Sequence, residues 1–153
     1  MRKQKIYLET TIFNYYFDVA RDGHADTVKL FEEIRTGKYE VYTSTYTTDE
    51  LLQADEPKRS NMLSLISEYE ITTLPGDDEA QNLSSIYINE GVIPASKRLD
   101  SLHISVATVN DLDYIFSFNF QHINRDKTKK MTSVINFREG YKPITIASPS
   151  EVV

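Results

Sequence analysis

Apolar residues recur along the chain at two spacings, one typical of buried strands and one typical of helices with a single apolar face. Short β-branched and aromatic runs predict strands over residues 5–8, 39–43, 71–74, 113–117 and 144–146. Recurrence every three or four residues predicts helices over residues 12–17, 26–37, 57–69, 77–90, 97–109 and 126–140, with another beginning within 44–50. Strands therefore alternate with helices, which favours a three-layer α/β/α fold with a mainly parallel central sheet.

At 153 residues the chain has the size of one domain, and no linker or internal repeat divides it, so we expect a single domain over residues 1–153. In folds of this class the functional site lies beyond the carboxyl ends of the strands. Glu9 and Asn119 follow two predicted strands, and Glu50 is expected near the first turn of the helix after a third strand. Three separate parts of the chain thus direct polar groups to one edge.

Charge is distributed unevenly along the sequence. The whole chain has a net charge of −6, whereas residues 121–142 carry +4, which leaves −10 on the remainder. A basic face could hold a polyanion while carboxylates elsewhere hold a cation, although a solvated, lysine-rich helix face is the more common explanation of such a stretch. The same helix offers Met131, Val134, Ile135 and Phe137 for packing.

Composition excludes several classes of protein. The sequence contains no cysteine, which rules out disulfides, thiolate metal sites, iron–sulfur clusters and cysteine nucleophiles. Its apolar runs are only a few residues long, so none can span a bilayer, and the run after basic residues 1–5 is too short for a signal peptide. We expect a cytoplasmic protein that does not bind membranes.

Several segments of the chain resemble PIN-domain proteins. In residues 6–15, IYLETTIFNY, a strand ends in an acidic residue followed by threonine, as at the start of that family. Residues 99–108, LDSLHISVAT, and 113–123, DYIFSFNFQHI, resemble its second half. The closing INFREGY and PSEV, at 135–141 and 149–152, are similar to the VapC-like branch. The resemblance covers nearly the whole chain, with an unspecific central part over residues 55–93.

This resemblance implies a Mg²⁺- or Mn²⁺-dependent ribonuclease, often the toxin of a toxin–antitoxin pair. The family's acidic positions correspond to Glu9, Glu50 and Asp100, and its fourth position to Asn119. The first position is usually Asp in the family, and the longer Glu9 moves the carboxylate by about 1 Å on a fixed backbone. The fourth position is frequently Asp, and Asn119 brings an uncharged amide instead. The partners implied are RNA, a cognate antitoxin and a second copy of the chain.

The chemistry of the residues supports a metal site independently. Converging carboxylates raise one another's pKa, and a divalent cation is the natural compensation. Oxygen ligands favour Mg²⁺ or Mn²⁺ over Zn²⁺, and the ion would activate a water molecule as the nucleophile. We expect Glu9 and Asp100 to bind the metal, Glu50 to bind metal or orient water, and Asn119 to hydrogen-bond a metal-bound water. Each of these four residues also has an ordinary structural explanation, namely helix capping, an interaction with a helix dipole or a place in a turn.

Cationic side chains flank the proposed site and are candidates for holding phosphates. Lys97 and Arg98 precede Asp100, and Arg125 and Lys127 follow Asn119. Thr10 and Thr11 are further candidates, either to steady the carboxylates or to contact phosphate, with capping as an equal alternative. His103 is expected to be a core histidine rather than a member of the site, and no partner can be assigned to His122.

Two other interpretations remain open. Glu9 and Asn119 also fit a catalytically weak or inactive PIN-like module that binds RNA or an antitoxin peptide. A phosphatase with an aspartyl nucleophile fits poorly, because Glu9-Thr10-Thr11 lacks a second Asp two residues on.

Overall fold

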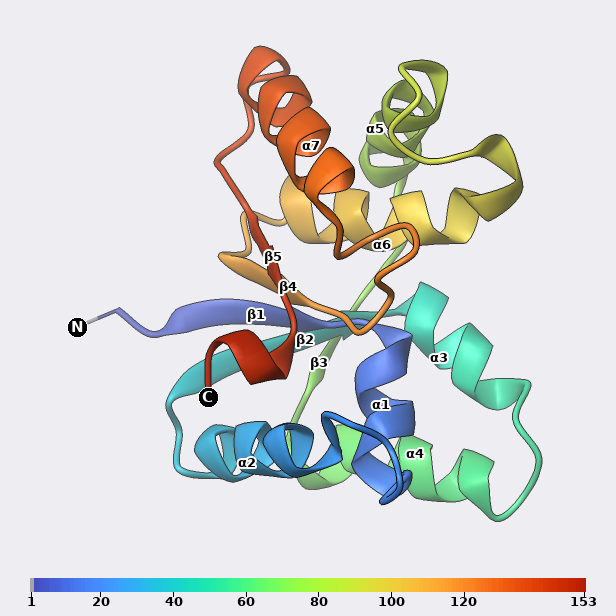
Figure 1. Cartoon of the computed structure of the whole chain (residues 1–153), viewed down its shortest axis with the longest axis vertical. Helices are drawn as coiled ribbons and strands as arrows, with labels where there is room; N and C mark the ends of the chain where they lie inside the picture. Colours follow the sequence, from blue (N-terminus) through green and yellow to red (C-terminus); the bar gives the residue numbers. More distant parts are fainter. Residues whose placement is uncertain (1) are drawn as a thin grey trace.

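The computed structural model describes residues 2–153 and contains one five-stranded parallel sheet in the order β3-β2-β1-β4-β5 (Figure 1). The strands are β1 (Gln4–Leu8), β2 (Tyr39–Ser44), β3 (Thr72–Leu74), β4 (Tyr114–Phe116) and β5 (Thr145–Ala147). All five lie where the sequence predicts them. The first strand is central, so both of its faces are covered, and Ile6, Tyr7 and Leu8 are fully buried.

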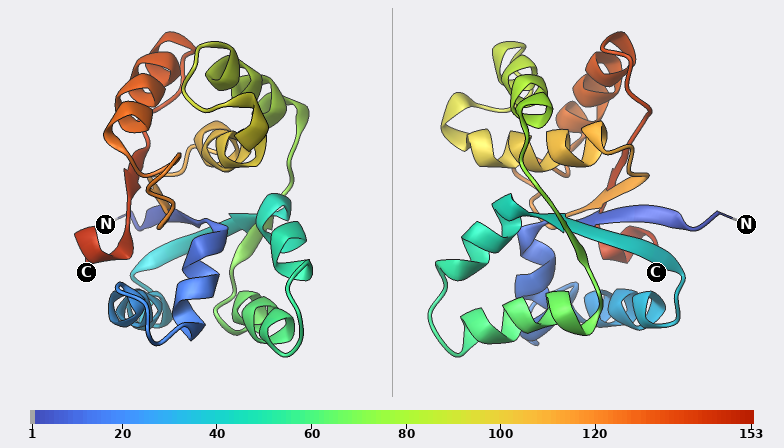
Figure 2. Two further views of the ribbon diagram at one scale, coloured as in Figure 1. Left: turned by 45° about the vertical axis from the view of Figure 1, so that its right-hand side comes forward. Right: turned by 180° about the vertical axis from the view of Figure 1, so that it is seen from behind.

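Helices cover both faces of this sheet, which confirms the three-layer α/β/α prediction (Figure 2). They are α1 (Thr10–Phe17), α2 (His24–Arg35), α3 (Thr45–Leu52), α4 (Lys58–Glu68), α5 (Asp78–Asn89), α6 (Arg98–Val109) and α7 (Asp126–Arg138), with short 3₁₀ turns η1 (Ala95–Lys97) and η2 (Pro149–Glu151). Helices α1, α2 and α4 pack on one face, and α5, α6 and α7 on the other.

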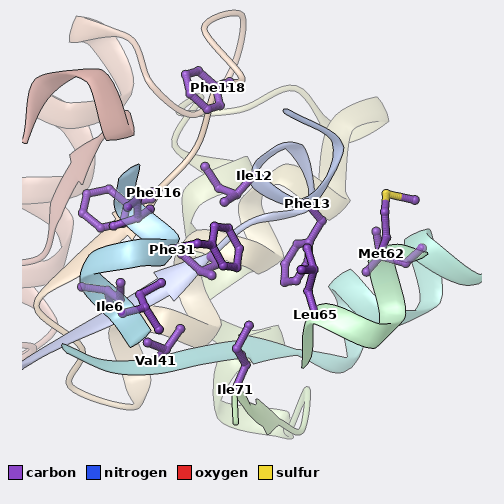
Figure 3. Packing of buried hydrophobic residues seen from close by; sticks show 14 of the residues in the cluster. Ile6, Ile12, Phe13, Phe31, Val41, Met62, Leu65, Ile71, Phe116 and Phe118 are labelled. Carbon is purple, nitrogen blue, oxygen red and sulfur yellow. The ribbon is translucent and has the colours of Figure 1, made fainter. Parts of the chain in front are cut away.

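Alternation along the strands divides the core into two clusters. Ile6 and Leu8 of β1 join the cluster beneath α1, α2 and α4, whereas Tyr7 joins the cluster beneath α5 and α6. Figure 3 shows the first cluster, with Phe31 and other large side chains filling the space between helices and sheet. Because side chains alternate between the faces of a strand, Tyr7 carries its hydroxyl into the opposite layer. That placement matters for the site described below.

Local signals at the helix ends explain why the chain changes direction where it does. Glu9 caps the N-terminus of α1, and Asp77 caps α5 by accepting a hydrogen bond from the Ala80 amide at 3.0 Å. Gly37 follows α2 with φ of +86°, a conformation that glycine adopts without strain. It therefore permits the reversal into β2, as predicted from the sequence.

Two local predictions are wrong. Glu50 lies in the second turn of α3, because that helix begins at Thr45. Val134 and Phe137 do not pack in the core: their side chains are 67% and 86% exposed. The buried face of α7 is formed instead by residues that include Thr132, Ile135 and Asn136. Polar side chains of this helix are therefore buried, while two of its apolar side chains are exposed.

Within residues 2–153, no helix is both long enough and apolar enough to cross a membrane.

Asp113 joins the start of β4 to the N-terminal and C-terminal parts of the chain. Its carboxylate accepts hydrogen bonds from Arg2 at 3.0 and 3.2 Å, from Lys142 at 2.8 Å and from the Lys5 amide at 2.8 Å. Burial alone would raise the pKa of Asp113, but these bonds outweigh burial and hold that pKa well below its ordinary value. The ionised carboxylate is therefore favoured by folding.

We predict that Asp113→Asn lowers the free energy of unfolding by about 2 kcal/mol at neutral pH, because charge-assisted hydrogen bonds are lost. A depressed carboxyl pKa stabilises the fold above the unfolded-state pKa of about 4, and this contribution disappears as the pH falls through the folded-state pKa. Urea denaturation should therefore show the difference from wild type shrinking below about pH 4. Exposed Asp111 provides the control Asp111→Asn, expected to change stability by less than about 0.5 kcal/mol. A pH-independent difference for Asp113→Asn would contradict this account.

Candidate functional site

The polar residues predicted at the sheet edge come together at the carboxyl ends of β1, β2 and β4. Glu9 follows β1, Asn119 lies three residues after β4, Glu50 lies on α3 directly after β2, and Asp100 lies in the first turn of α6. The charge of Glu50 affects the pKa of both Glu9 and Asp100, so the three carboxylates share one electrostatic environment. Adjacent parallel strands end at the same edge, which explains the convergence.

Glu9 is held by one of its two carboxylate oxygens. Its side chain is nearly inaccessible, with the residue 3% exposed, and Oε1 accepts hydrogen bonds from the hydroxyls of Ser117 and Thr11, each at 2.6 Å. The Thr11 amide also donates to Oε1, at 3.3 Å, which is the helix cap of α1. Burial raises the pKa of Glu9, and the hydrogen bonds and the nearby His103 offset this only in part. A cation beside Glu9 would favour its ionised form.

Glu50 is also held through only one of its two carboxylate oxygens. Its Oε1 accepts a hydrogen bond from Thr10 Oγ1 at 2.6 Å and pairs with His103 Nε2 at 2.7 Å. Burial opposes ionisation of Glu50, but His103 and Thr10 together lower its pKa below the ordinary value. Thr10, predicted to steady a carboxylate, contact phosphate or cap a helix, is only 8% exposed and directs its hydroxyl to the Glu50 carboxylate. Glu50 is therefore an ionised carboxylate held in a fixed position.

A chain of buried hydrogen bonds supports Glu50 from within the core. Tyr7 Oη lies 2.6 Å from Ser44 Oγ and 2.6 Å from His103 Nδ1, and all three residues are fully buried. Burial opposes the charged imidazole, yet the hydrogen bond to Glu50 and the charges of Glu9, Glu50 and Asp100 raise the pKa of His103 overall. His103 is a satisfied core histidine, as predicted, and the charges of all three carboxylates of the site also act on it.

Asp100 and Asn119 form the other side of the site. Asp100 is partly buried, which raises its pKa, while His103 and a hydrogen bond from the Asn119 amide act in the opposite direction. The side-chain oxygen Oδ1 of Asn119 accepts a hydrogen bond from the backbone amide of His122 at 3.0 Å. The backbone N–H of Asn119 donates to Ser117 Oγ at 2.9 Å. The turn after β4 thus fixes the Asn119 side chain, which faces Asp100.

The donor set fits a hard divalent cation with few protein ligands. Hydrogen bonds from residues 2–153 reach only Oε1 of Glu9 and of Glu50, so Oε2 of each carboxylate is without a protein partner in this part of the chain. No group of three or more His, Asp or Glu side chains among the described residues is arranged to hold one metal ion. Mg²⁺ commonly binds through one or two carboxylates and completes its shell with water, so a site with few free carboxylate oxygens fits this ion.

The predicted cationic residues differ in how far they are available. Lys97, Arg98 and Lys127 are exposed at the N-terminal ends of α6 and α7. Arg125 is partly buried, and its guanidinium donates to Thr128 Oγ1 at 3.2 Å and to the Val92 carbonyl at 3.4 Å. Arg125 thus ties the start of α7 to the segment that follows α5. The side chains of Lys97 and Lys127 lie in solvent, and the exposed Arg98 guanidinium also donates to Ser85 Oγ at 3.4 Å.

Sequence reasoning missed two residues that organise the site. Ser117 bridges Glu9 and the turn at Asn119, and Tyr7 orients His103. Each carries a hydroxyl within an otherwise apolar strand run, and a polar atom buried in this way needs a partner. That requirement is a signal present in the sequence, although it does not identify the partner.

Comparison with known proteins gives a clear result for structure only. No protein-family profile matches the sequence, and no curated protein matches it. Among solved structures, the fold is similar to VapC20 of Mycobacterium tuberculosis, described as a toxin that cleaves the sarcin–ricin loop, with a TM-score of 0.57, 10% identity, and coverage of 76% of this chain and 92% of that one. It is also similar to VapBC2 of Rickettsia felis bound to a DNA fragment from its promoter, with a TM-score of 0.57, 12% identity, and coverage of 94% and 97%.

These similarities establish the fold class. The chain has a VapC-like PIN fold, with the parallel five-stranded sheet between two helical layers that the sequence predicts. At 10% and 12% identity the similarity is one of fold, so the activity must be argued from the residues of this site.

We predict that Glu50→Gln lowers the pKa of His103. The substitution removes the hydrogen-bonded carboxylate that raises this pKa, while the burial that opposes the charged imidazole remains. An NMR titration of the imidazole resonances measures the change directly. Exposed Glu32 provides the control Glu32→Gln, which should leave the titration of His103 unchanged. An unaltered His103 pKa in Glu50→Gln would show that the pair does not determine the protonation of His103.

Proposed function

We propose that this protein, a single PIN-like domain over residues 1–153, is a cytoplasmic endoribonuclease that depends on Mg²⁺ or Mn²⁺. Its substrate is single-stranded or structured RNA, and its biological role is that of a toxin paired with an antitoxin. The site residues are Glu9, Glu50, Asp100 and Asn119.

One observation carries this proposal: two carboxylates with raised pKa lie beside a third that is held ionised, all at the carboxyl edge of a PIN-like fold. Burying several like charges together is unfavourable unless a cation compensates them. His103 supplies at most one positive charge to three carboxylates. The remaining imbalance is what a divalent cation would neutralise.

Glu9 and Asp100 are the residues that would hold the metal. When bound, the ion would supply Lewis acidity, which lowers the pKa of water and stabilises negative charge on a phosphate. Two carboxylates are sufficient for Mg²⁺, because this ion retains several waters. The second carboxylate oxygen of Glu9 is the one without a protein hydrogen bond from residues 2–153.

The protein's own side chains would perform the positioning. Glu50 Oε1 is fixed by Thr10 and His103, which leaves Oε2 to accept a hydrogen bond from the attacking water and orient it toward phosphorus. Asn119, whose carbonyl oxygen is fixed by the His122 amide, would donate through its side-chain nitrogen to Asp100 or to water in the site. An amide at this position would orient Asp100 or water without adding a further negative charge.

The substrate would approach along the exposed cations. Lys97 and Arg98 lie within one turn of Asp100, and Lys127 lies at the start of α7, so the backbone phosphates of a bound RNA would have cationic partners on two helices. Arg125 would contribute through the donors not already used within the protein. The described substrate of VapC20 makes a folded RNA loop a reasonable first substrate, and VapBC2 makes an antitoxin a reasonable partner.

A second candidate function is a PIN-like module that binds RNA or an antitoxin peptide with little or no cleavage. The structural role of Glu9 favours it, since this carboxylate caps α1 and is 3% exposed. Binding of RNA that persists without any cleavage in Mg²⁺ or Mn²⁺ would support the second function over the first.

We predict that Asp100→Asn reduces RNA cleavage by at least about 100-fold, because a metal carboxylate ligand is replaced by a neutral amide. Cleavage of a folded RNA loop is measured with Mn²⁺, with Mg²⁺ and with chelator, and chelator should abolish it. Asp111→Asn should retain wild-type activity, since Asp111 is exposed beyond the end of α6. Full activity of Asp100→Asn, with circular dichroism showing a folded protein, would overturn the mechanism.

We also predict that Lys97→Ala and Arg98→Ala weaken RNA binding for all sequences alike. Each substitution should reduce the slope of log affinity against log salt concentration by about 1, the value expected for one lost phosphate contact. RNA binding is measured by fluorescence anisotropy in the Asp100→Asn background, so that the RNA is not cleaved during the titration. The control Lys29→Ala removes an exposed lysine of α2 and should leave the slope unchanged. Equal slopes for all variants would exclude Lys97 and Arg98 from the binding surface.

A further inference from the structure

An aromatic side chain lies exposed beside the candidate site. Phe120 directly follows Asn119 in the turn after β4 and is 58% exposed, although phenylalanine is among the residues most often buried. The side chain of Asn119 hydrogen-bonds Asp100, so the exposed ring borders the carboxylates of the site. The role proposed for the site gives Phe120 no function.

The turn that carries Phe120 is held in place. The backbone N–H of Phe120 donates to the Phe118 carbonyl at 3.0 Å, and that of Asn124 donates to the Asn119 carbonyl at 2.8 Å. The buried side chain of Asn124 also donates to the Ser117 carbonyl at 3.2 Å. These bonds fix the backbone on both sides of Phe120, so its exposure is a feature of the folded turn.

Phe120 is the outermost of a group of aromatic rings. Its ring centroid lies 6.3 Å from that of Phe118, with the two planes at 74°, which is an edge-to-face contact. Phe118 stacks in turn on Tyr15 of α1, with centroids 3.9 Å apart and planes at 5°. Phe118 lies at the margin of the core cluster (Figure 3) and is buried. Phe120 is supported by this group and keeps most of its own surface open to a planar ligand.

The chemistry around Phe120 fits a nucleotide. Arg125 and Lys127 follow the turn within a few residues, and Lys127 is exposed at the start of α7. A nucleotide carries an anionic phosphate and an aromatic base, and this surface offers cations for the first and an open ring for the second. An apolar protein side chain would use the ring but would leave the cations without a counterpart.

We propose that Phe120 stacks on an unpaired base of the RNA, beside the nucleotide whose phosphate enters the carboxylate site. This inference rests on the proposed function and adds which RNA the site accepts. A base inside a duplex is covered on both faces by its neighbours, so only a nucleotide in a loop, a bulge or a single strand can stack on the ring. Phe120 therefore determines specificity for unpaired over paired RNA.

The first test measures binding of an RNA hairpin with a purine loop, by fluorescence anisotropy in the Asp100→Asn protein. Phe120→Ala should weaken binding by about 10-fold or more, the loss expected for one stacked base. Phe120→Leu, which stays apolar but has no aromatic face, should lose most of the same affinity, and Phe120→Tyr should keep it. The slope of log affinity against log salt concentration should stay the same, because no phosphate contact is removed.

A matched control removes another exposed ring. Phe137 lies in the last turn of α7, about 16 Å along that helix from its first residue, Asp126. Phe137→Ala should bind the hairpin as tightly as the Asp100→Asn protein does.

The second test identifies the contact as one with an unpaired base. Loop nucleotides of the hairpin are replaced one at a time by abasic ribose. At one position this replacement should weaken binding about as much as Phe120→Ala does, and the two losses should not add, because both remove the same contact. A fully paired RNA duplex should be bound equally with and without Phe120→Ala.

The outcomes separate this inference from the proposed function. Hairpin binding that Phe120→Ala leaves unchanged would overturn the inference and leave the nuclease proposal standing. Equal losses for hairpin and duplex, or losses that add at every abasic position, would also overturn it, because the contact would not depend on an unpaired base. An RNA that the Asp100→Asn protein does not bind and the wild type does not cleave would overturn both. A ring needed only for binding another protein would belong to that interface instead.

Discussion

Burial of carboxylates around a single imidazole is the constraint on which this site depends. Glu9 is almost completely inaccessible and Asp100 is partly so, and burial raises the pKa of both. His103 offsets part of this cost and is itself held by Glu50 and Tyr7. The arrangement keeps Glu50 ionised and leaves Glu9 and Asp100 in need of positive charge. This charge imbalance is the basis of the proposal that the site binds a cation.

The fold converts this constraint into geometry. Parallel strands place the ends of β1, β2 and β4 side by side, so residues from four distant parts of the sequence meet without a long connecting loop. The hydroxyls of Thr10, Thr11 and Ser117 then fix one oxygen of each of two carboxylates. Positioning by groups that are themselves buried is stiffer than positioning by exposed side chains, which the proposed attack on a phosphate would require.

Much of this architecture could be predicted from the sequence, because it follows from local patterns. Strand and helix positions come from the spacing of apolar residues, and the edge at which Glu9, Glu50 and Asn119 meet follows from alternation of the elements. The contacts among them could not be predicted. Nothing local to His103 indicates Glu50 as its partner, since 53 residues separate them. Likewise, the exposure of Phe137 depends on which face of α7 the sheet selects, and Thr132 and Asn136 show that this face is not simply the most apolar one.

The most direct test of the central claim is metal binding itself, measured by Mn²⁺ titration with electron paramagnetic resonance. The account predicts a saturable Mn²⁺ site in the wild-type protein that Asp100→Asn weakens strongly and Asp111→Asn does not. The absence of a saturable site in wild type, or equal affinity in all three proteins, would contradict it.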